Sequence, residues 1–193
     1  KTWYWLNLND TKVAWDSEVT PCSITTDGYV DAFYDVQSND YADISASVKT
    51  GVGEAADVLF AADNIKSLVI NADKNADNKV IYVNVDDSAA EDKKVNQAGK
   101  LVVNAEDDVT FTIIETFKGT EGVAGNTAFR TLIDAGKNSH VKLVQVFLQP
   151  KEQDVLSDIG SRCADEAGFE LVQLFLGEGS LYDGIRTDLK GNK

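Results

Sequence analysis

The sequence predicts an all-β protein: a right-handed parallel β-helix (β-solenoid) with coils of about 28–30 residues, preceded by a less regular N-terminal segment. One apolar run occurs three times, with starts 30 and 28 residues apart, as Phe111–Phe117, Val141–Phe147 and Phe169–Phe175. The runs are short, rich in β-branched and aromatic residues, and bounded by Asn, Asp and Gly, which is typical of strands. A period that holds two or more short strands fits one solenoid coil, which buries its apolar face on the coils above and below.

The repeating unit is a strand, a turn, a second strand and a longer connection. A further apolar run precedes each of the first two copies, Leu101–Ala105 before Glu-Asp-Asp and Thr131–Ala135 before Gly-Lys-Asn-Ser. A β-sandwich with strands every 8–12 residues is the competing all-β architecture. The near-identity of the three copies favours the solenoid.

The first half of the chain is less regular. An aromatic opening predicts the core of a capping or flanking element, and residues 86–99 (DDSAAEDKKVNQAG) predict a polar connection. We expect a flanking segment at 1–65 and a β-helix core at 66–193, truncated at its C-terminal end. The opening's apolar residues are Trp3, Trp5, Leu6, Leu8, Val13 and Trp15, and the predicted strands are Tyr29–Val36, Val58–Ala61, Leu68–Ala72 and Val80–Val85.

The charge balance narrows the classes of partner. Eighteen Lys and Arg face 32 Asp and Glu, a formal net charge of −14, which disfavours nucleic acid and anionic membrane surfaces. With 43% hydrophobic residues the chain can still bury a core. No stretch approaches the roughly 20 apolar residues of a spanning helix, and no leader opens the sequence. We therefore expect a soluble, cytoplasmic protein, and two cysteines fit a reducing compartment.

Asp73–Asp77 resembles the start of a calcium loop, because alternate oxygen-bearing side chains converge on a hard cation. Such a loop needs Gly at its sixth position and Glu at its twelfth, where this chain has Asn78 and Asn84. An Asx-rich turn between two strands explains the same residues and is the favoured interpretation.

The only histidine, His140, follows a turn and has no histidine partner. In the aligned copies its position holds Thr110 and Gly168, so the repeat does not require an imidazole there. We expect a surface turn residue rather than a metal ligand or a titrating group.

Cys163 aligns with Ala105 and Ala135, twelve residues before the final Phe of each copy. This alignment favours a buried, inert thiol over a nucleophile or a metal or persulfide carrier. Cys22 follows Pro21 in a polar segment and is interpreted as incidental.

Glu115, Gln145 and Gln173 align as a polar column. A solvated ladder on one face is favoured over a binding groove or a polar interior passage. The sequence contains no phosphate-binding loop, and a Ser–His–Asp arrangement would depend on His140 alone. We assign no catalytic, cofactor-binding or metal-binding residue, and we expect that the chain is not an enzyme.

Residues 101–191 resemble a known family. The runs VVNAEDDVTFTIIETF, NTAFRTLIDAGKNSHVKLVQVFLQ and ADEAGFELVQLFLGEGSLYDGIRTDLKGN are similar to the β-helical core of the SufB/SufD family of iron–sulfur cluster assembly proteins. The opening Thr2–Asp10 is similar to the tryptophan-containing segment near the start of such chains. Together these segments cover somewhat over half of the sequence.

The resemblance implies a scaffold. In that family a C-terminal helical region binds the SufC ATPase, and B-type and D-type proteins pair so that a cluster forms between them. The family's late C-S-H-G-A-T motif has no match here, so no ligand residue is carried over, and the D-type is the better fit. The resemblance thus implies a SufB-like paralogue and a SufC-like ABC ATPase as partners. The chain itself is expected to bind no cofactor, with iron–sulfur cluster and ATP entering only through those partners.

Two other functions compete with the scaffold. A carbohydrate-binding or cell-surface β-helix also suits an acidic chain with Asp-rich turns, although aligned acidic columns along a groove are not visible. A calcium-binding module rests on Asp73–Asp77 alone. A solenoid cut after Leu189 leaves open strand edges, and a homodimer through that end is a hypothesis.

Overall fold

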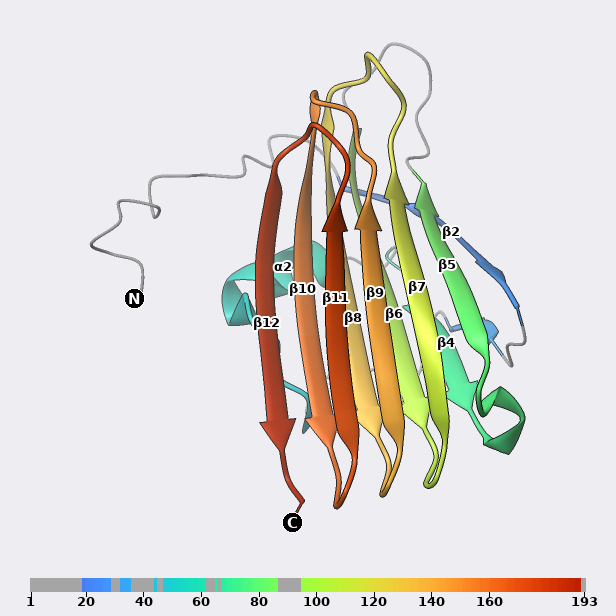
Figure 1. Cartoon of the computed structure of the whole chain (residues 1–193). Helices are drawn as coiled ribbons and strands as arrows, with labels where there is room; N and C mark the ends of the chain where they lie inside the picture. Colours follow the sequence, from blue (N-terminus) through green and yellow to red (C-terminus); the bar gives the residue numbers. More distant parts are fainter. Residues whose placement is uncertain are drawn as a thin grey trace.

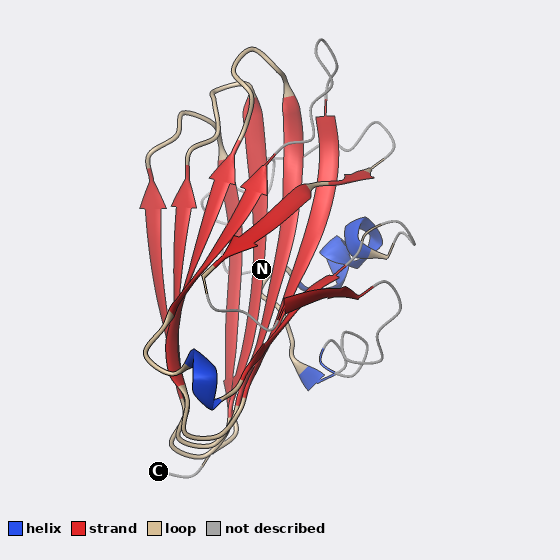
Figure 2. Ribbon diagram, turned by 90° about the vertical axis from the view of Figure 1, so that its right-hand side faces the viewer, coloured by secondary structure: helices blue, strands red, loops and turns tan. Residues whose placement is uncertain are grey.

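The computed structural model describes residues 19–28, 32–35, 44, 47–61, 65, 67–86 and 95–191. Two β-sheets face one another and form a flattened parallel solenoid (Figures 1 and 2). Sheet A has the strand order β12-β10-β8-β6-β4-β3, with β1 on β6, and sheet B has the order β11-β9-β7-β5-β2. Sheet A contains β1 (Thr20–Pro21), β3 (Ala32–Asp35), β4 (Ser67–Ala72), β6 (Val95–Ala105), β8 (Gly125–Ala135), β10 (Gln153–Cys163) and β12 (Leu181–Leu189). Sheet B contains β2 (Ser23–Asp27), β5 (Val80–Asp86), β7 (Thr110–Lys118), β9 (His140–Phe147) and β11 (Gly168–Phe175).

From β4 onward the chain alternates between the sheets, and every pairing among these strands is parallel. Each coil is therefore one strand of sheet A, a tight turn, one strand of sheet B and a longer loop. The registers match the repeat found in the sequence: Ala105 pairs with Ala135, and Ala135 with Cys163. The expected all-β parallel solenoid is confirmed.

The two ends of the solenoid differ. At the N-terminal end β2 pairs antiparallel with β5, and β3 pairs antiparallel with β4, so each sheet begins with a strand of opposite direction. At the other end β11 and β12 each have a hydrogen-bonded neighbour on one side only, within the residues that the structure describes. We call the surface formed by β11 and β12 the open end.

The tight turns repeat a backbone conformation in each coil. Asn78, Asp108, Asn138 and Glu166 all have positive φ, between 55° and 62°. Asn and Asp tolerate this left-handed region better than other non-glycine residues, which explains the Asn and Asp between the strands. Neighbouring turns are also joined, since Asn138 Nδ2 donates to Asp108 Oδ1 at 2.8 Å.

The core lies between the sheets and is built from columns of like residues. Phe117, Phe147 and Phe175 stack with ring centroids 4.9 and 5.6 Å apart. In strands β7 and β9 of sheet B burial alternates, because their outward side chains are at least partly exposed. In sheet A strands such as β8 are buried on both faces. The outer face of sheet A must therefore be covered.

The cover is formed by the described residues between 44 and 61, which include the short helix α2 (Asp57–Phe60) and the 3-10 turn η3 (Gly53–Ala56) before it. We call this part the covering segment. Ile44 and Val48 pack on apolar side chains of three sheet A strands. A Cβ added to Gly160 would lie 2.7 Å from the Lys49 carbonyl oxygen, so the segment runs close over β10.

Several predicted elements need correction. Val58–Ala61 was predicted as a strand, but Asp57–Phe60 is helical and packs on sheet A. The polar connection predicted for 86–99 is wrong at both ends, because β5 includes Asp86 and β6 begins at Val95. Strand β3 covers Ala32–Asp35 of the predicted strand Tyr29–Val36, and the rest of that range lies outside the described residues. The aromatic opening, with its three tryptophans, also lies outside the described residues. Leu68–Ala72 and Val80–Val85 are strands as predicted.

Candidate functional site

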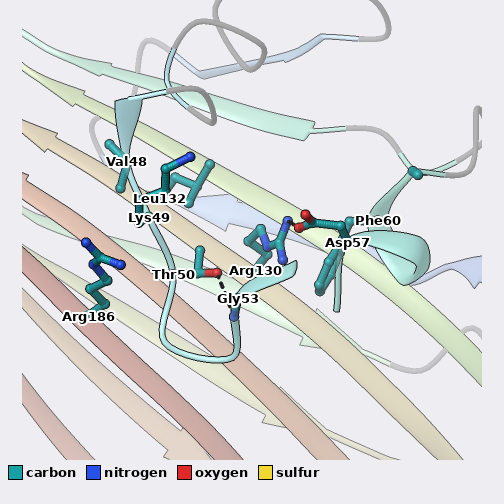
Figure 3. Close-up of a pocket in the computed structure, with 10 residues that line it drawn as sticks. Val48, Lys49, Thr50, Gly53, Asp57, Phe60, Arg130, Leu132 and Arg186 are labelled. Carbon is teal, nitrogen blue, oxygen red and sulfur yellow. Dashed lines mark hydrogen bonds and ion pairs between the residues drawn. The ribbon is translucent and has the colours of Figure 1, made fainter. Parts of the chain in front are cut away.

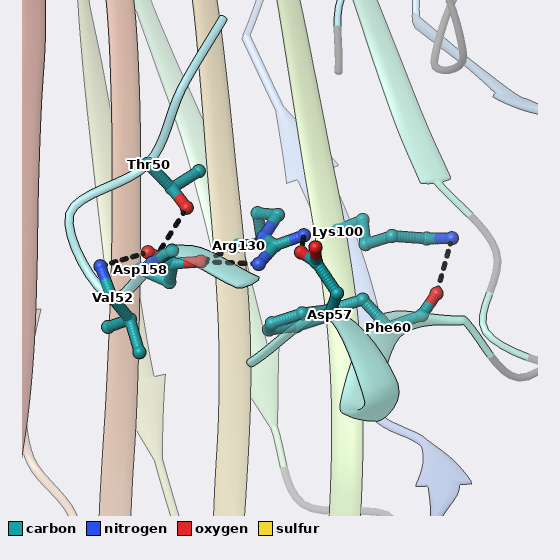
Figure 4. A network of polar contacts seen from close by, with 8 residues as sticks. Thr50, Val52, Asp57, Phe60, Lys100, Arg130 and Asp158 are labelled. Atoms are coloured by element: carbon teal, nitrogen blue, oxygen red, sulfur yellow. Dashed lines mark hydrogen bonds and ion pairs between the residues drawn. The ribbon is translucent and has the colours of Figure 1, made fainter. Parts of the chain in front are cut away.

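A charged row crosses the outer face of sheet A beneath the covering segment (Figure 4). Lys100, Arg130 and Asp158 pair in register on β6, β8 and β10. The Arg130 guanidinium lies 2.7–2.8 Å from Asp158 Oδ2 and 2.8 Å from Asp57 Oδ1, and it covers the Phe60 ring at 4.4 Å from its centroid. Arg130 thus joins a carboxylate of the sheet to a carboxylate of the covering segment.

Two further bonds attach the covering segment. Asp158 Oδ1 accepts from the Val52 N–H at 2.9 Å, and Lys100 Nζ donates to the Phe60 carbonyl at 3.2 Å. Burial, and then the nearby Arg130 charge, lower the pKa of Lys100. All six residues in these contacts hold the segment on the sheet, so we describe the row as a clamp rather than as a reaction centre.

A pocket of about 600 Å³ lies beside this clamp (Figure 3). Its lining includes three cations, Lys49, Arg130 and Arg186, and one carboxylate, Asp57. Arg130 is committed to two carboxylates, whereas Arg186 is more exposed and pairs with Asp188 at 3.2 Å. Sequence reasoning missed this site, although Lys100, Arg130 and Asp158 share a register on three neighbouring strands.

The predicted column of Glu115, Gln145 and Gln173 exists, but it lies inside the solenoid. Glu115 is 0% and Gln145 1% exposed, so the favoured solvated ladder was wrong. Gln173 Nε2 donates to Gln145 Oε1 at 2.9 Å, and Gln145 Nε2 donates to Glu115 Oε2 at 2.8 Å. Thr131 Oγ1 from sheet A donates to Glu115 Oε1 at 2.7 Å. We call these residues the interior ladder.

The interior ladder changes the protonation of its buried carboxylate. Burial raises the pKa of Glu115 from 4.5 to about 7, against the opposing effect of the bonds from Gln145 and Thr131. Desolvation thus outweighs two hydrogen-bond donors. The side chain has no solvent exposure, so its role is structural.

The open end exposes groups that are buried in every earlier coil. The inward-facing side chains of β12 are those at odd positions, because they continue the columns of Val155, Ile159 and Cys163. Phe175 is 61% exposed, although Phe117 and Phe147 in the same column are buried. The large exposed apolar side chains here are Leu174, Phe175, Leu176, Ile185 and Leu189. Among the described residues, this end therefore combines exposed apolar side chains with strand edges.

The remaining predicted residues do not form a site in the described part of the chain. His140 is exposed and pairs in register with Thr110 and Gly168, as predicted. Cys163 is 1% exposed, and burial raises the pKa of its thiol, which agrees with the predicted inert cysteine. Asp73 caps a 3-10 turn by accepting from the Asn75 N–H at 2.8 Å, the Asx-type role that was favoured.

Cys22 is more than incidental, since it is buried in the core and its thiol pKa is raised to about 12 by burial. Among the described residues no group of three or more His, Cys, Asp and Glu side chains is placed to hold a metal ion.

Comparison with models of protein families, with curated proteins and with solved structures finds no match for the chain. The resemblance to SufB/SufD therefore rests on the sequence segments quoted above. No described helix has the length and apolar character needed to cross a membrane.

Proposed function

We propose that the chain is a non-catalytic scaffold that binds protein partners. The observation that carries this proposal is the stack of parallel coils, whose clamp and interior ladder hold the fold together. Stacked coils present a long and rigid surface of the kind that repeat proteins use to bind other proteins. The acidic charge disfavours nucleic acid and anionic membranes as alternatives.

The resemblance supplies a more specific version of the proposal. A D-type member of the SufB/SufD family would work in the cytoplasm, pair with a SufB-like paralogue and bind a SufC-like ABC ATPase. Iron–sulfur cluster and ATP would then belong to the assembly and its partners. The quoted sequence segments support this version.

Affinity capture from the native host, followed by mass spectrometry and an assay for iron and sulfide, tests it. Recovery of an ABC-type ATPase together with a cysteine-bearing paralogue is the expected result. Recovery of neither protein would reject the Suf assignment.

Carbohydrate binding is the alternative function, and the pocket beside the clamp is the observation in its favour. Lys49 and Arg186 would attract an acidic sugar, and Thr50 would supply a hydroxyl. The test is titration of the chain with acidic oligosaccharides. Saturable binding that is lost in Arg186→Gln but kept in Lys142→Gln, on the outer face of sheet B, would favour this alternative over the scaffold.

A further inference from the structure

The loop at residues 49–53 of the covering segment is fixed against sheet A by its backbone. The Gly51 N–H donates to the Ile159 carbonyl oxygen at 3.1 Å. A Cβ added to Gly51 would collide with the backbone of Gly184 and Ile185, so the loop reaches β12 with no side chain between them. The loop therefore holds its own side chains in place above β10 and β12.

The same loop presents an oriented hydroxyl group to the pocket beside the clamp. Thr50 Oγ1 accepts from the Gly53 N–H at 3.3 Å, and both residues line the pocket (Figure 3). This bond fixes the position of the oxygen and leaves the hydroxyl proton available to a second partner.

Three cations line this pocket from three different elements, and two of them keep unused donors. Arg130 of β8 is committed to two carboxylates. Within the described part of the chain, no hydrogen bond or ion pair joins the Lys49 ammonium to another residue. Arg186 of β12 uses Nε to bond Asp188 at 3.2 Å, which leaves its two terminal nitrogens. A chain of net charge −14 thus gathers two available cations at one cavity.

The available donors fit a phosphate group better than a carboxylate. They are the ammonium of Lys49, the hydroxyl of Thr50 and the guanidinium edge of Arg186. A phosphate monoester carries a charge of about −1.5 to −2 at pH 7 and three acceptor oxygens, one for each donor group. A guanidinium bonds phosphate through parallel N–H groups, and an ammonium acts as a point charge. A carboxylate has one charge and two oxygens, so it would leave part of this set unused.

The charge and the size of the pocket agree with such a ligand. Three cations against one carboxylate, Asp57, give the lining a formal charge of +2. The Asp57 carboxylate already pairs with Arg130 at 2.8 Å, and Asp188, outside the lining, offsets part of the Arg186 charge. The volume of about 600 Å³ lies within the range of about 300–1,000 Å³ that is typical of small-molecule sites.

We propose that this pocket binds the phosphate group of a small molecule, with Lys49, Thr50 and Arg186 as the residues that hold it. The proposal goes beyond the scaffold function and does not depend on it. It differs from the acidic-sugar alternative in the anion that the pocket takes. Lys49 and Thr50 belong to the covering segment and Arg186 belongs to sheet A, so a bound phosphate joins the two. Binding should therefore hold the covering segment more firmly on the sheet.

Isothermal titration calorimetry of the full chain tests whether the site exists. The probes are inorganic phosphate, glycerol phosphate and glucuronate, each at the same ionic strength set with NaCl. Glycerol phosphate should bind saturably and more tightly than inorganic phosphate, because the rest of the pocket can enclose its glycerol part. Equal or tighter binding of inorganic phosphate would assign the site to the free ion. Glucuronate, whose anion is a carboxylate, should bind at least about 10-fold more weakly.

Charge-removing variants test the residues. Lys49→Gln and Arg186→Gln should each weaken the binding of glycerol phosphate by about 10- to 100-fold, the loss expected for one charge-assisted hydrogen bond. Lys142→Gln, which removes a cation from the outer face of sheet B, should leave the affinity unchanged. Neither Lys49 nor Arg186 takes part in the clamp, and urea unfolding without ligand checks that both variants fold.

Limited proteolysis with thermolysin, which does not require Lys or Arg at its cleavage site, tests the link to the covering segment. Glycerol phosphate should slow cleavage within 44–61 in the wild-type chain and should have no effect in Lys49→Gln. Binding without any change in cleavage would overturn this link.

The phosphate site itself would be overturned by either of two results. One is the absence of saturable binding for both phosphate probes, and the other is an affinity that is unchanged in both Lys49→Gln and Arg186→Gln. Equal affinity for glucuronate and glycerol phosphate would overturn the assignment of phosphate as the preferred anion.

Discussion

Glu115 shows how a repeat position is adapted to its place in the solenoid. The following coils carry Gln145 and Gln173 at this position, and each glutamine donates to the residue one coil nearer the N-terminal end. The next residue in that direction is Val83, which offers no side-chain acceptor. The interior ladder therefore ends at Glu115, where a carboxyl group accepts from both Gln145 and Thr131.

Glu115 should make the chain less stable as the pH rises. Its folded-state pKa of about 7 lies above the unfolded value of 4.5, so its full contribution to stability is present below pH 4.5 and is lost as the pH rises to about 7. At 1.36 kcal/mol per pKa unit the loss is about 3 kcal/mol. Glu115→Gln should therefore stabilise the fold above pH 7, measured by urea unfolding from pH 4.5 to 8.

The matched control is Glu170→Gln, since Glu170 is exposed and pairs with the exposed Lys142. Its effect on the free energy of unfolding should be within about 0.5 kcal/mol at every pH. If Glu115→Gln destabilises the chain at pH 8, the fold favours the ionised carboxylate of Glu115. In that case burial does not make ionisation of Glu115 destabilising.

Arg130 should contribute far more than a surface ion pair. Its removal leaves the fully buried Asp158 without its guanidinium, and breaking a buried pair from one side costs about 3–5 kcal/mol. We expect a loss of this size for Arg130→Met in urea unfolding. Lys142→Met, which removes an exposed pair, should cost less than about 1 kcal/mol. Equal losses would show that the clamp is not coupled to folding.

At the scale of elements, the strands of sheet B were easier to predict than those of sheet A. Sheet B strands are exposed on one face and so keep the alternation that identifies a strand. The central sheet A strands β6 and β8 are buried on both faces beneath the covering segment, which removes the alternation and concealed where β6 begins. Asp57–Phe60 is too short to show a helical period and forms its helix in contact with the sheet.

The sequence predicts correctly that Glu115 belongs to a column of polar residues, but the column was assigned to the solvent-facing side of the sheet instead of the interior. Glu115 has the same parity as Phe111, Ile113 and Phe117, and alternate residues of a strand share one face. That signal was outweighed by the general tendency of Glu and Gln to be exposed. The clamp could not be found in this way, because Asp57 meets Arg130 only through the tertiary path of the covering segment.

The covering segment should respond to a single added methyl group. In Gly160→Ala the new Cβ would lie 2.7 Å from the Lys49 carbonyl oxygen and 3.0 Å from Val48 Cγ1, so the segment must shift. We expect a loss of about 1–3 kcal/mol and faster proteolytic cleavage within 44–61. Thr112→Ala, at a partly exposed outward position of sheet B, should leave the cleavage rate unchanged. Unchanged cleavage in Gly160→Ala would show that the segment does not lie against β10.

At the scale of the whole molecule, the net charge opposes folding. The chain carries a formal charge of −14, so its carboxylates repel one another in the compact state, and salt screens that repulsion. The free energy of unfolding should therefore rise as NaCl rises from about 20 to about 300 mM, measured by urea unfolding. A free energy of unfolding that falls with salt would show that ion pairs such as those of the clamp outweigh the repulsion.

Hydrogen exchange, measured by mass spectrometry on the free chain and in the presence of the captured partners, tests the central claim that the chain is a protein-binding scaffold. The account predicts that the partners increase protection in one contiguous part of the solenoid and leave the other strands unchanged. Unchanged protection throughout the chain would contradict it.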